Sequence, residues 1–152
     1  MEDRLFRTAM GKFATGVTVI TTKVGDTVHG MTANAFMSVS LNPKLVLVSV
    51  SEKANMNRLI KESGTFAVSV LNEQQQDLSA YFAGQSKEEK NIRFDTFNDM
   101  PVIPDALVNV TCNVHQSVIA GDHTLYIGEV TDLRVQDGEP LGFFEGKYKK
   151  VI

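Results

Sequence analysis

The sequence predicts a single domain, 1–152, that is mainly β with peripheral α-helices, its strands forming a small closed or nearly closed β-barrel. A near-continuous apolar run, 45–50, is typical of a strand buried on both faces. The segment 108–115 alternates between apolar and polar residues, as a half-buried strand does. Turn dipeptides such as Gly25-Asp26 and Gly121-Asp122 join short strands, which favours antiparallel pairing. Helices and strands do not alternate regularly, so a doubly wound fold is the second choice.

The remaining elements follow from periodicity and from turn residues. The apolar positions of 5–13 recur at helical spacing, and Gly16 is expected to end that helix. Gly64 is the expected C-terminal cap of a second helix, and Asn72 with Gln75 forms a capping-box pattern for a third. The predicted helices are 5–13, 53–62 and 72–83, and the predicted strands are 17–22, 28–35, 45–50, 66–71, 108–115, 123–135 and 141–145. The charged stretch 85–98 is predicted to be a surface loop, 100–104 an extended connector, and 146–148 a short basic tail.

Composition excludes several classes of protein. The net charge is −3 and the basic residues are scattered, so neither nucleic acid nor an anionic membrane is an expected partner. No apolar run approaches the roughly 20 residues of a membrane span, and the acidic N-terminus lacks a signal-peptide pattern. The single cysteine, Cys112, falls in phase with the core positions of its strand and suits a reducing cytoplasm. We therefore expect a cytoplasmic protein.

Several common site motifs are missing or incomplete. There is no G-x-G-x-x-G after a predicted strand, and the glycine spacing of a P-loop at 11–18 carries Val17 where the phosphate-binding lysine must stand. Cys112 and His115 lack a second pair of ligands, so no metal site is predicted. No G-x-S-x-G nucleophile elbow occurs. If the protein is an enzyme, a bound cofactor is expected to supply its difficult chemistry.

Three polar clusters remain as candidate sites. A turn of small residues is predicted at 30–34, and the ordinary explanation is a hairpin end. Ser49, Ser51, Lys53 and Asn55 precede a helix, where backbone N–H groups and the helix dipole favour an anion such as phosphate; simple helix capping is an equal alternative. His123 follows a tight turn and is either a solvated loop residue or a donor to an anionic or carbonyl-bearing ligand.

Five segments in order along the chain resemble the short-chain flavin reductase family, whose members are reductase components of two-component aromatic monooxygenases; the resemblance is strongest to the phenol 2-hydroxylase type. These segments are FRTAMGKFATGVTVITT, HGMTANAFMSVSLNPKLVLVSV, YFAG, AGDHTLYIGEV and LGFFEGKY. The resemblance implies a flavin-binding split β-barrel and a homodimer with flavin near the subunit interface. It also implies NAD(P)H:flavin oxidoreductase activity with FAD or FMN and NADH, serving a separate oxygenase. A non-turnover flavin electron carrier, or a flavin or haem-type binding module on the same barrel, remains the alternative.

The resemblance also assigns roles to residues. Those similar to the segment along the isoalloxazine and ribityl chain are Met31, Thr32, Ala33, Asn34 and Ala35, with Ser38 and Val39 just beyond. Those similar to the ribityl-phosphate loop are Ser49, Ser51, Glu52, Lys53 and Ala54, with Asn55, Asn57 and Arg58 nearby. Phe82 and Ala83 would lie near the flavin, His123 would face and orient the nicotinamide, and Gly146, Lys147 and Tyr148 would help cover the pyridine nucleotide. Hydride would pass from nicotinamide C4 to flavin N5 between stacked rings, with no side-chain acid or base.

Overall fold

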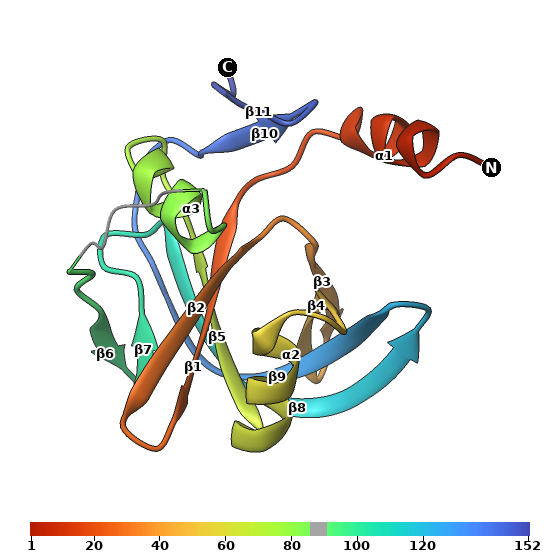
Figure 1. The fold of residues 1–152 in the computed structure, drawn as a ribbon. Helices are drawn as coiled ribbons and strands as arrows, with labels where there is room; N and C mark the ends of the chain where they lie inside the picture. The colour runs from red at the N-terminus through yellow and green to blue at the C-terminus, as the bar shows by residue number, and fades with distance from the viewer. Residues whose placement is uncertain (86–90) are drawn as a thin grey trace.

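The computed structural model describes residues 1–85 and 91–152, and within them one antiparallel sheet of seven strands dominates (Figure 1). The strand order is β2-β1-β5-β8-β9-β4-β3. The strands of this sheet are β1 (Thr18–Val24), β2 (Thr27–Ala33), β3 (Phe36–Leu41), β4 (Lys44–Ser51), β5 (Thr65–Val70), β8 (Val108–Ala120) and β9 (His123–Val135). The helices are α1 (Asp3–Gly11), α2 (Asn55–Ser63) and α3 (Gln76–Phe82), and two small hairpins pair β6 (Asp95–Phe97) with β7 (Met100–Val102) and β10 (Gly142–Phe144) with β11 (Lys147–Lys149).

The sheet is rolled, because its two outermost strands are neighbours along the chain. β2 and β3 stand at opposite ends of the strand order, yet only Asn34 and Ala35 separate them. The backbone N–H of Ser49 in β4 donates to the Ala35 carbonyl at 3.1 Å and fixes this link on the sheet. We call the place where the two edges approach the seam. A rolled sheet with such a seam confirms the predicted split barrel, and the antiparallel pairing of its strands shows that the doubly wound alternative is wrong.

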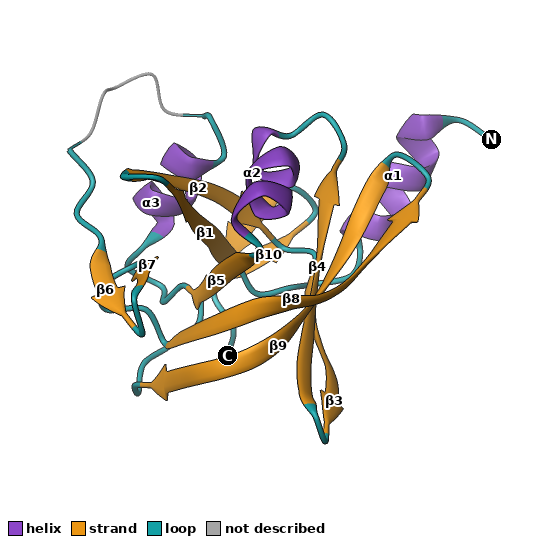
Figure 2. Cartoon of the chain, turned by 90° about the horizontal axis from the view of Figure 1, so that it is seen from below, coloured by secondary structure: helices purple, strands orange, loops and turns teal. Residues whose placement is uncertain are grey.

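Alternation along the strands places two apolar clusters on opposite faces of the sheet. The inner cluster joins Ile20, Val48, Phe66 and Tyr126, and α2 packs into the hollow of the sheet through Met56 and Ile60 (Figure 2). The outer cluster contains Val19 of β1, whose side chain points to the face opposite that of Ile20, and residues before and after the strands. Its members are Val17, Val19, Leu71, Ile103, Ala106 and Leu141. This outer layer carries α3 and the β10–β11 hairpin, both of which border the candidate site.

The strand β4 corrects one prediction. It was expected to be buried on both faces, but only one face is: Val46, Val48 and Val50 are buried. Leu47 and Ser49 on the other face are half-buried. Their partial exposure has a physical reason, because both residues line a large groove described below.

The stretch predicted as a surface loop and an extended connector contains a hairpin instead. Asp95–Phe97 pairs with Met100–Val102, and β7 is buried against β5. The guanidinium of Arg134 lies 4.9 Å from the centre of the Phe97 ring, so a cation–π contact ties the hairpin to β9. Strands of three residues are too short to show a period, which is why the sequence pattern missed them. Residues 86–90 of the predicted loop lie outside the described residues.

Both ends of the chain and the segment after β1 differ from the prediction in detail. The first helix ends at Gly11 rather than at Gly16, and none of its residues is buried; Phe6 and Met10 are 54% and 57% exposed. Residues 30–33, predicted as part of a turn, lie within β2. The predicted tail 146–148 contributes to the β10–β11 hairpin. Gly64 does cap α2, with a left-handed φ of 73°.

Candidate functional site

A large groove and a small hollow border the link between β2 and β3, and an outer hollow adjoins them along β2. The large groove has a volume of about 810 Å³, the small hollow about 160 Å³ and the outer hollow about 580 Å³. Asn34 lines both the large groove and the small hollow, and Ala83 lines both the small hollow and the outer hollow. The predicted small-residue segment therefore stands at the centre of one branched cleft.

The large groove runs between α1 and the seam, and its walls are mostly apolar. Met10 and Phe13 border it from the helix side, and Phe36 and Leu47 border it from the sheet. Three of the predicted site residues line it: Asn34, Ala35 and Ser49. A groove with apolar walls and a few polar groups is typical of sites that hold flat heterocyclic ligands.

The small hollow lies between β2, α3 and the C-terminal hairpin. Its lining contains five predicted residues: Thr32, Ala33, Asn34, Ala83 and Tyr148. The Thr32 hydroxyl donates to the Ser79 carbonyl at 2.6 Å, and the Ser79 hydroxyl lies 2.7 Å from the Tyr148 hydroxyl. Ser79 is 1% exposed, so these hydrogen bonds join β2, α3 and β11 behind the surface of the hollow.

The outer hollow follows β2 between α2 and α3 and is rich in aromatic side chains. Met31, Asn55 and Phe82 were predicted, and Tyr81 and Phe94 were not. An ideal Cβ on Gly30 would lie 2.6 Å from Cε1 of Phe82, so the ring rests directly on the β2 backbone. Gly30 is therefore required for close approach, and this explains one of the small residues in the predicted segment.

The loop between β4 and α2 adjoins the turn between β8 and β9. The backbone N–H of Glu52 donates to the Asp122 carbonyl at 2.9 Å, and His123 pairs with Ser51 across the two strands. His123 Nδ1 lies 2.8 Å from an Asp122 carboxylate oxygen. This hydrogen bond, then the charge of His123 and more weakly that of Lys53, lowers the pKa of Asp122, so the carboxylate is ionised beside both groups.

The first turn of α2 has free hydrogen-bonding capacity. Ala54 occupies the N-cap position and offers no side-chain acceptor to the first N–H groups of the helix. Lys53 is exposed immediately before this position. An uncapped helix N-terminus next to a lysine suits a phosphate group, as the sequence pattern predicts.

The structure does not bring every predicted residue into this cleft. Asn57 is 3% exposed, and its side chain bonds Val50, Thr124 and Tyr126 within the core. Arg58 is exposed on α2, with Glu62 3.8 Å away. Nine other predicted residues line none of the three hollows. They are Ser38 and Val39 on exposed β3, Ser51, Glu52, Lys53 and Ala54 between the end of β4 and α2, His123 at the start of β9, and Gly146 and Lys147 at the β10–β11 turn.

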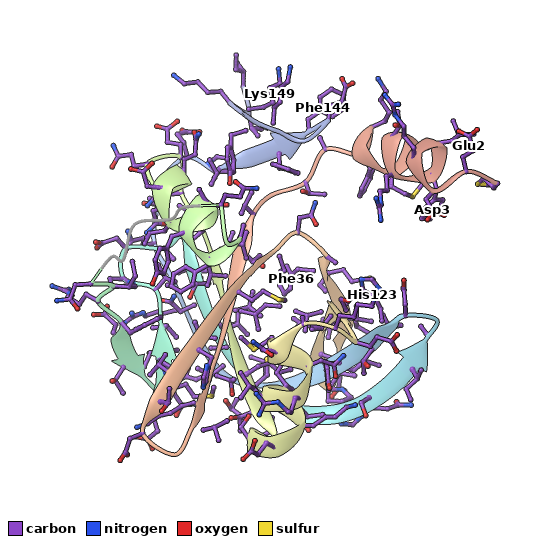
Figure 3. All side chains as sticks on the ribbon, in the orientation of Figure 1. Glu2, Asp3, Phe36, His123, Phe144 and Lys149 are labelled. Carbon is purple, nitrogen blue, oxygen red and sulfur yellow. The ribbon has the colours of Figure 1, made fainter. Side chains whose placement is uncertain are left out.

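The two segments assigned to the nicotinamide are also far apart within one chain. Figure 3 shows Phe144 and Lys149 of the C-terminal hairpin at one end of the molecule and His123 at another. His123 lies instead beside Ser51 at the end of β4. One chain alone therefore does not place His123 and Tyr148 on the same ligand ring.

Sequence reasoning missed several residues that line the cleft. Thr15, Val17, Ser79 and Phe143 belong to this group. Thr15 and Phe143 exchange two backbone hydrogen bonds of 3.0 and 2.9 Å, which hold β10 against the entry to β1. The Thr15 hydroxyl oxygen is buried and has no hydrogen-bond partner in the part of the chain that the structure describes. Thr15 and Phe143 both lie in segments that carry the family resemblance, FRTAMGKFATGVTVITT and LGFFEGKY, but nothing in the spacing around either residue marks it as part of a site.

The residues present fit a flavin. Its ring system is flat and apolar with one polar edge, and the large groove offers apolar walls beside Asn34, Ser49 and the unpaired Thr15 hydroxyl. Within residues 1–85 and 91–152 there is no group of three or more His, Cys, Asp or Glu side chains placed to hold a metal ion. No described helix is long and apolar enough to cross a membrane.

Comparison with known proteins identifies the family of this chain. The family model described as flavin reductase like domain matches residues 10–151. An NADH-dependent flavin reductase of Rhodococcus sp. is 47% identical over 148 residues, covering 95% of this chain and 84% of that protein. The reductase component of 4-hydroxyphenylacetate 3-monooxygenase from Thermus thermophilus is 36% identical, covering 97% of this chain and 95% of that protein.

Solved structures give the same result. The flavin reductase PheA2 in its native state is 57% identical with a TM-score of 0.98, covering 100% of this chain and 99% of that one. The Streptomyces globisporus NADH:FAD oxidoreductase SgcE6, solved with NAD and FAD fragments, is 35% identical with a TM-score of 0.91, covering 99% and 93%. The resemblance predicted from the five sequence segments is confirmed, and the chain belongs to the flavin reductase like domain family.

Proposed function

We propose that this protein is an NADH-dependent flavin reductase that reduces FAD or FMN and supplies the reduced flavin to a separate aromatic monooxygenase of the phenol-hydroxylating type. The observation that carries the proposal is the branched cleft around Asn34, in a chain 57% identical along its length to a flavin reductase of known structure. Relatives named as NADH-dependent flavin reductases and as monooxygenase reductase components support the choice of nicotinamide and of partner.

The flavin is proposed to lie along the link between β2 and β3. Thr32, Ala33, Asn34 and Ala35 would contact the ring system and the ribityl chain, because small residues allow close approach of the backbone. Its phosphate would point towards Lys53 and the uncapped start of α2, where positive charge and free N–H groups coincide.

The flavin, when bound, supplies the two-electron acceptor for the nicotinamide hydride. The protein contributes binding and orientation, which lower the barrier by holding two flat rings in contact. The apolar wall of Phe36 and Leu47 would exclude water from the ring face of a flavin bound in the large groove. His123, hydrogen-bonded to Asp122, is proposed to orient the nicotinamide carboxamide.

A homodimer is proposed to complete the site. One candidate interface is formed by exposed apolar side chains beside the large groove: Leu5, Phe6 and Met10 of α1, Phe13 just after it, and Met37 of β3. Monomeric proteins rarely expose a contiguous apolar surface of this kind. A partner subunit seated there would cover the large groove and bring its own segments to the ligand. Light scattering should then give twice the chain mass, and Phe6→Glu with Met10→Glu should yield monomers; a monomeric wild type would contradict the dimer.

The cytoplasm is the proposed location, because the single cysteine, Cys112, is a buried free thiol and proteins of reducing compartments are kept without disulfides. Reduced flavin would leave the cleft and reach the oxygenase by diffusion. The three hollows are open to solvent in the described chain, in keeping with exchange of flavin during turnover.

The decisive test is NADH oxidation by the purified protein under air, with and without added FAD, FMN and riboflavin. Turnover that saturates with added flavin is expected. A protein that stays yellow but does not turn over free flavin would instead be an electron carrier or a binding module.

Residue roles are tested in the same assay. Lys53→Ala should raise the flavin Kd more than it lowers kcat, whereas Lys61→Ala, on the exposed part of α2, should change neither. His123→Ala should raise the KM for NADH. An unchanged flavin Kd in the first variant, or unchanged turnover and NADH affinity in the last, would remove that residue from its role.

A further inference from the structure

Ser79 is the meeting point of three parts of the fold that border the small hollow. Its carbonyl accepts a hydrogen bond from Thr32 of β2 at 2.6 Å, and its hydroxyl lies 2.7 Å from that of Tyr148 in β11. Ser79 itself belongs to α3 and is 1% exposed. The side chains of Thr32 and Tyr148 thus reach the same buried residue from opposite walls of the hollow.

The C-terminal hairpin is held at its turn by Glu145, whose backbone N–H donates to the Gly11 carbonyl at 2.9 Å and whose carboxylate lies 2.8 Å from Lys12 Nζ. Its strands face the small hollow through Phe143 and Tyr148. Phe143 exchanges backbone hydrogen bonds with Thr15, and its ring meets that of Tyr148 at 5.6 Å between centroids. The Tyr148 hydroxyl is directed at Ser79, and the tyrosine ring therefore forms the wall of the hollow. Position 148 thereby sets the separation between the hairpin and β2.

We infer that Ser79 and Tyr148 are positioning residues: their hydroxyl pair is a latch that holds the C-terminal hairpin at a fixed distance from Thr32–Asn34 and so sets the width of the small hollow. This inference rests on the proposed function, because the hollow is taken to receive part of a flat ring ligand. A hollow of about 160 Å³ matches the size of cavities that hold a single six-membered ring, about 150 Å³. Neither hydroxyl touches the reacting atoms, and the latch acts through Thr32 and through the tyrosine ring.

The latch is tested with Ser79→Ala, Tyr148→Phe and the double variant. Each single change removes the same hydrogen bond, so each should weaken flavin binding by about fivefold, and the double variant should be no weaker than the singles. The kcat at saturating flavin should change less than the flavin KM, because binding and not the hydride step depends on the width of the hollow.

Ser63→Ala is the matched control. It removes a hydroxyl pair of the same length, 2.7 Å to Thr22, at the far end of α2 and away from all three hollows. It also removes the hydrogen bonds of the Ser63 hydroxyl with the Thr65 backbone, at 2.9 and 3.3 Å, so its effect on stability is an upper limit for the loss of the pair. It should lower the unfolding midpoint about as much as Ser79→Ala while leaving flavin affinity unchanged. A purely structural role for Ser79 would make the two variants alike in flavin affinity as well, and would overturn the inference.

Amide hydrogen exchange of the flavin-free protein gives a readout that needs no activity. Loss of the latch should accelerate exchange in 142–149 and in 31–34, and Ser63→Ala should not. Unchanged exchange in those segments, or additive effects of Ser79→Ala and Tyr148→Phe on flavin affinity, would refute the latch. If the wild type failed to turn over flavin, the proposed function would fall, whereas the exchange result would still decide the latch.

Discussion

Asn57 carries the sharpest prediction about how the phosphate end of the site is held in place. Its Nδ2 group donates to the carbonyls of Val50 and Ser51 and to the Thr124 hydroxyl, at 3.2, 3.3 and 3.0 Å. Its Oδ1 accepts a 2.6 Å hydrogen bond from the Tyr126 hydroxyl. One side chain therefore joins the end of β4, the start of α2 and β9, and Asn57→Ala removes all four contacts.

The expected cost follows from these contacts. The Tyr126 hydroxyl keeps a second acceptor, the backbone carbonyl of residue 57 at 2.9 Å, so it still donates a hydrogen bond in the variant. The carbonyls and the Thr124 hydroxyl lose a buried donor, and each such loss costs about 1–3 kcal/mol. Together with the space left by the amide, Asn57→Ala should lower the free energy of unfolding by at least about 3 kcal/mol, which corresponds to a fall of at least roughly 6 °C in Tm for a chain of this size.

Thermal and urea unfolding, followed by circular dichroism without flavin, measures this loss. Glu62→Ala is the control, since its exposed ion pair with Arg58 at 3.8 Å is worth only about 0.3–0.5 kcal/mol. Flavin affinity should fall together with stability, because the loop loses its anchor. An Asn57→Ala protein as stable as the wild type but deficient in flavin binding would refute the structural role and restore direct contact with the ligand.

Three further predictions concern packing. Gly30→Ala would place a Cβ 2.6 Å from the Phe82 ring. Thermal unfolding should show a stability loss of about 1–3 kcal/mol, and flavin titration should show weaker binding; no change in either measurement would contradict the close contact. Gly128→Ala would place a Cβ 2.6 Å from Phe66 and 2.7 Å from Cys112 in the inner core, and should lower stability by a similar 1–3 kcal/mol with flavin affinity retained. Burial raises the pKa of the Cys112 thiol to about 12, so a thiol reagent at pH 8 should react only after denaturation. The free energy of unfolding should also fall as the pH rises above about 8.5, because there the thiol ionises in the unfolded chain but not in the folded protein. Rapid labelling of the native protein would refute this.

Most of the fold follows from local signals in the sequence. The left-handed cap at Gly64 is decided by residues within one element and is confirmed. The alternation around Cys112 correctly predicts a strand, but the strand is not half-buried along 109–112, because the polar residues Asn109 and Thr111 are buried as well. The hairpin at Asp95 was not foreseen because its stability comes from Arg134, far along the chain. The exposure of α1 was equally invisible, since an amphipathic pattern says that one face is apolar but not what covers it.

The site was predicted in outline and not in detail. The segment Thr32–Ala35 does lie at the centre of the cleft, but the position of Asn57 in the phosphate-loop sequence concealed its role in the core. Ser79 was missed because its importance comes from two partners, Thr32 and Tyr148, that are 47 and 69 residues away in sequence. Spacing along the chain carries no information about such contacts.

The seam has a consequence for how the protein is made. The hairpins β1–β2 and β3–β4 are local and are complete by residue 51, yet β5, β8 and β9 stand between them in the sheet. A nascent chain that has been synthesised as far as the end of β8 therefore already contains every residue assigned to the flavin ring. Without β9 it lacks the complete curved sheet that brings the edge strands β2 and β3 together. Contacts of such long sequence separation form late in folding. Flavin binding should thus appear only when synthesis has passed Val135. The flavin would then bind the completed barrel and would not assist the early steps of folding.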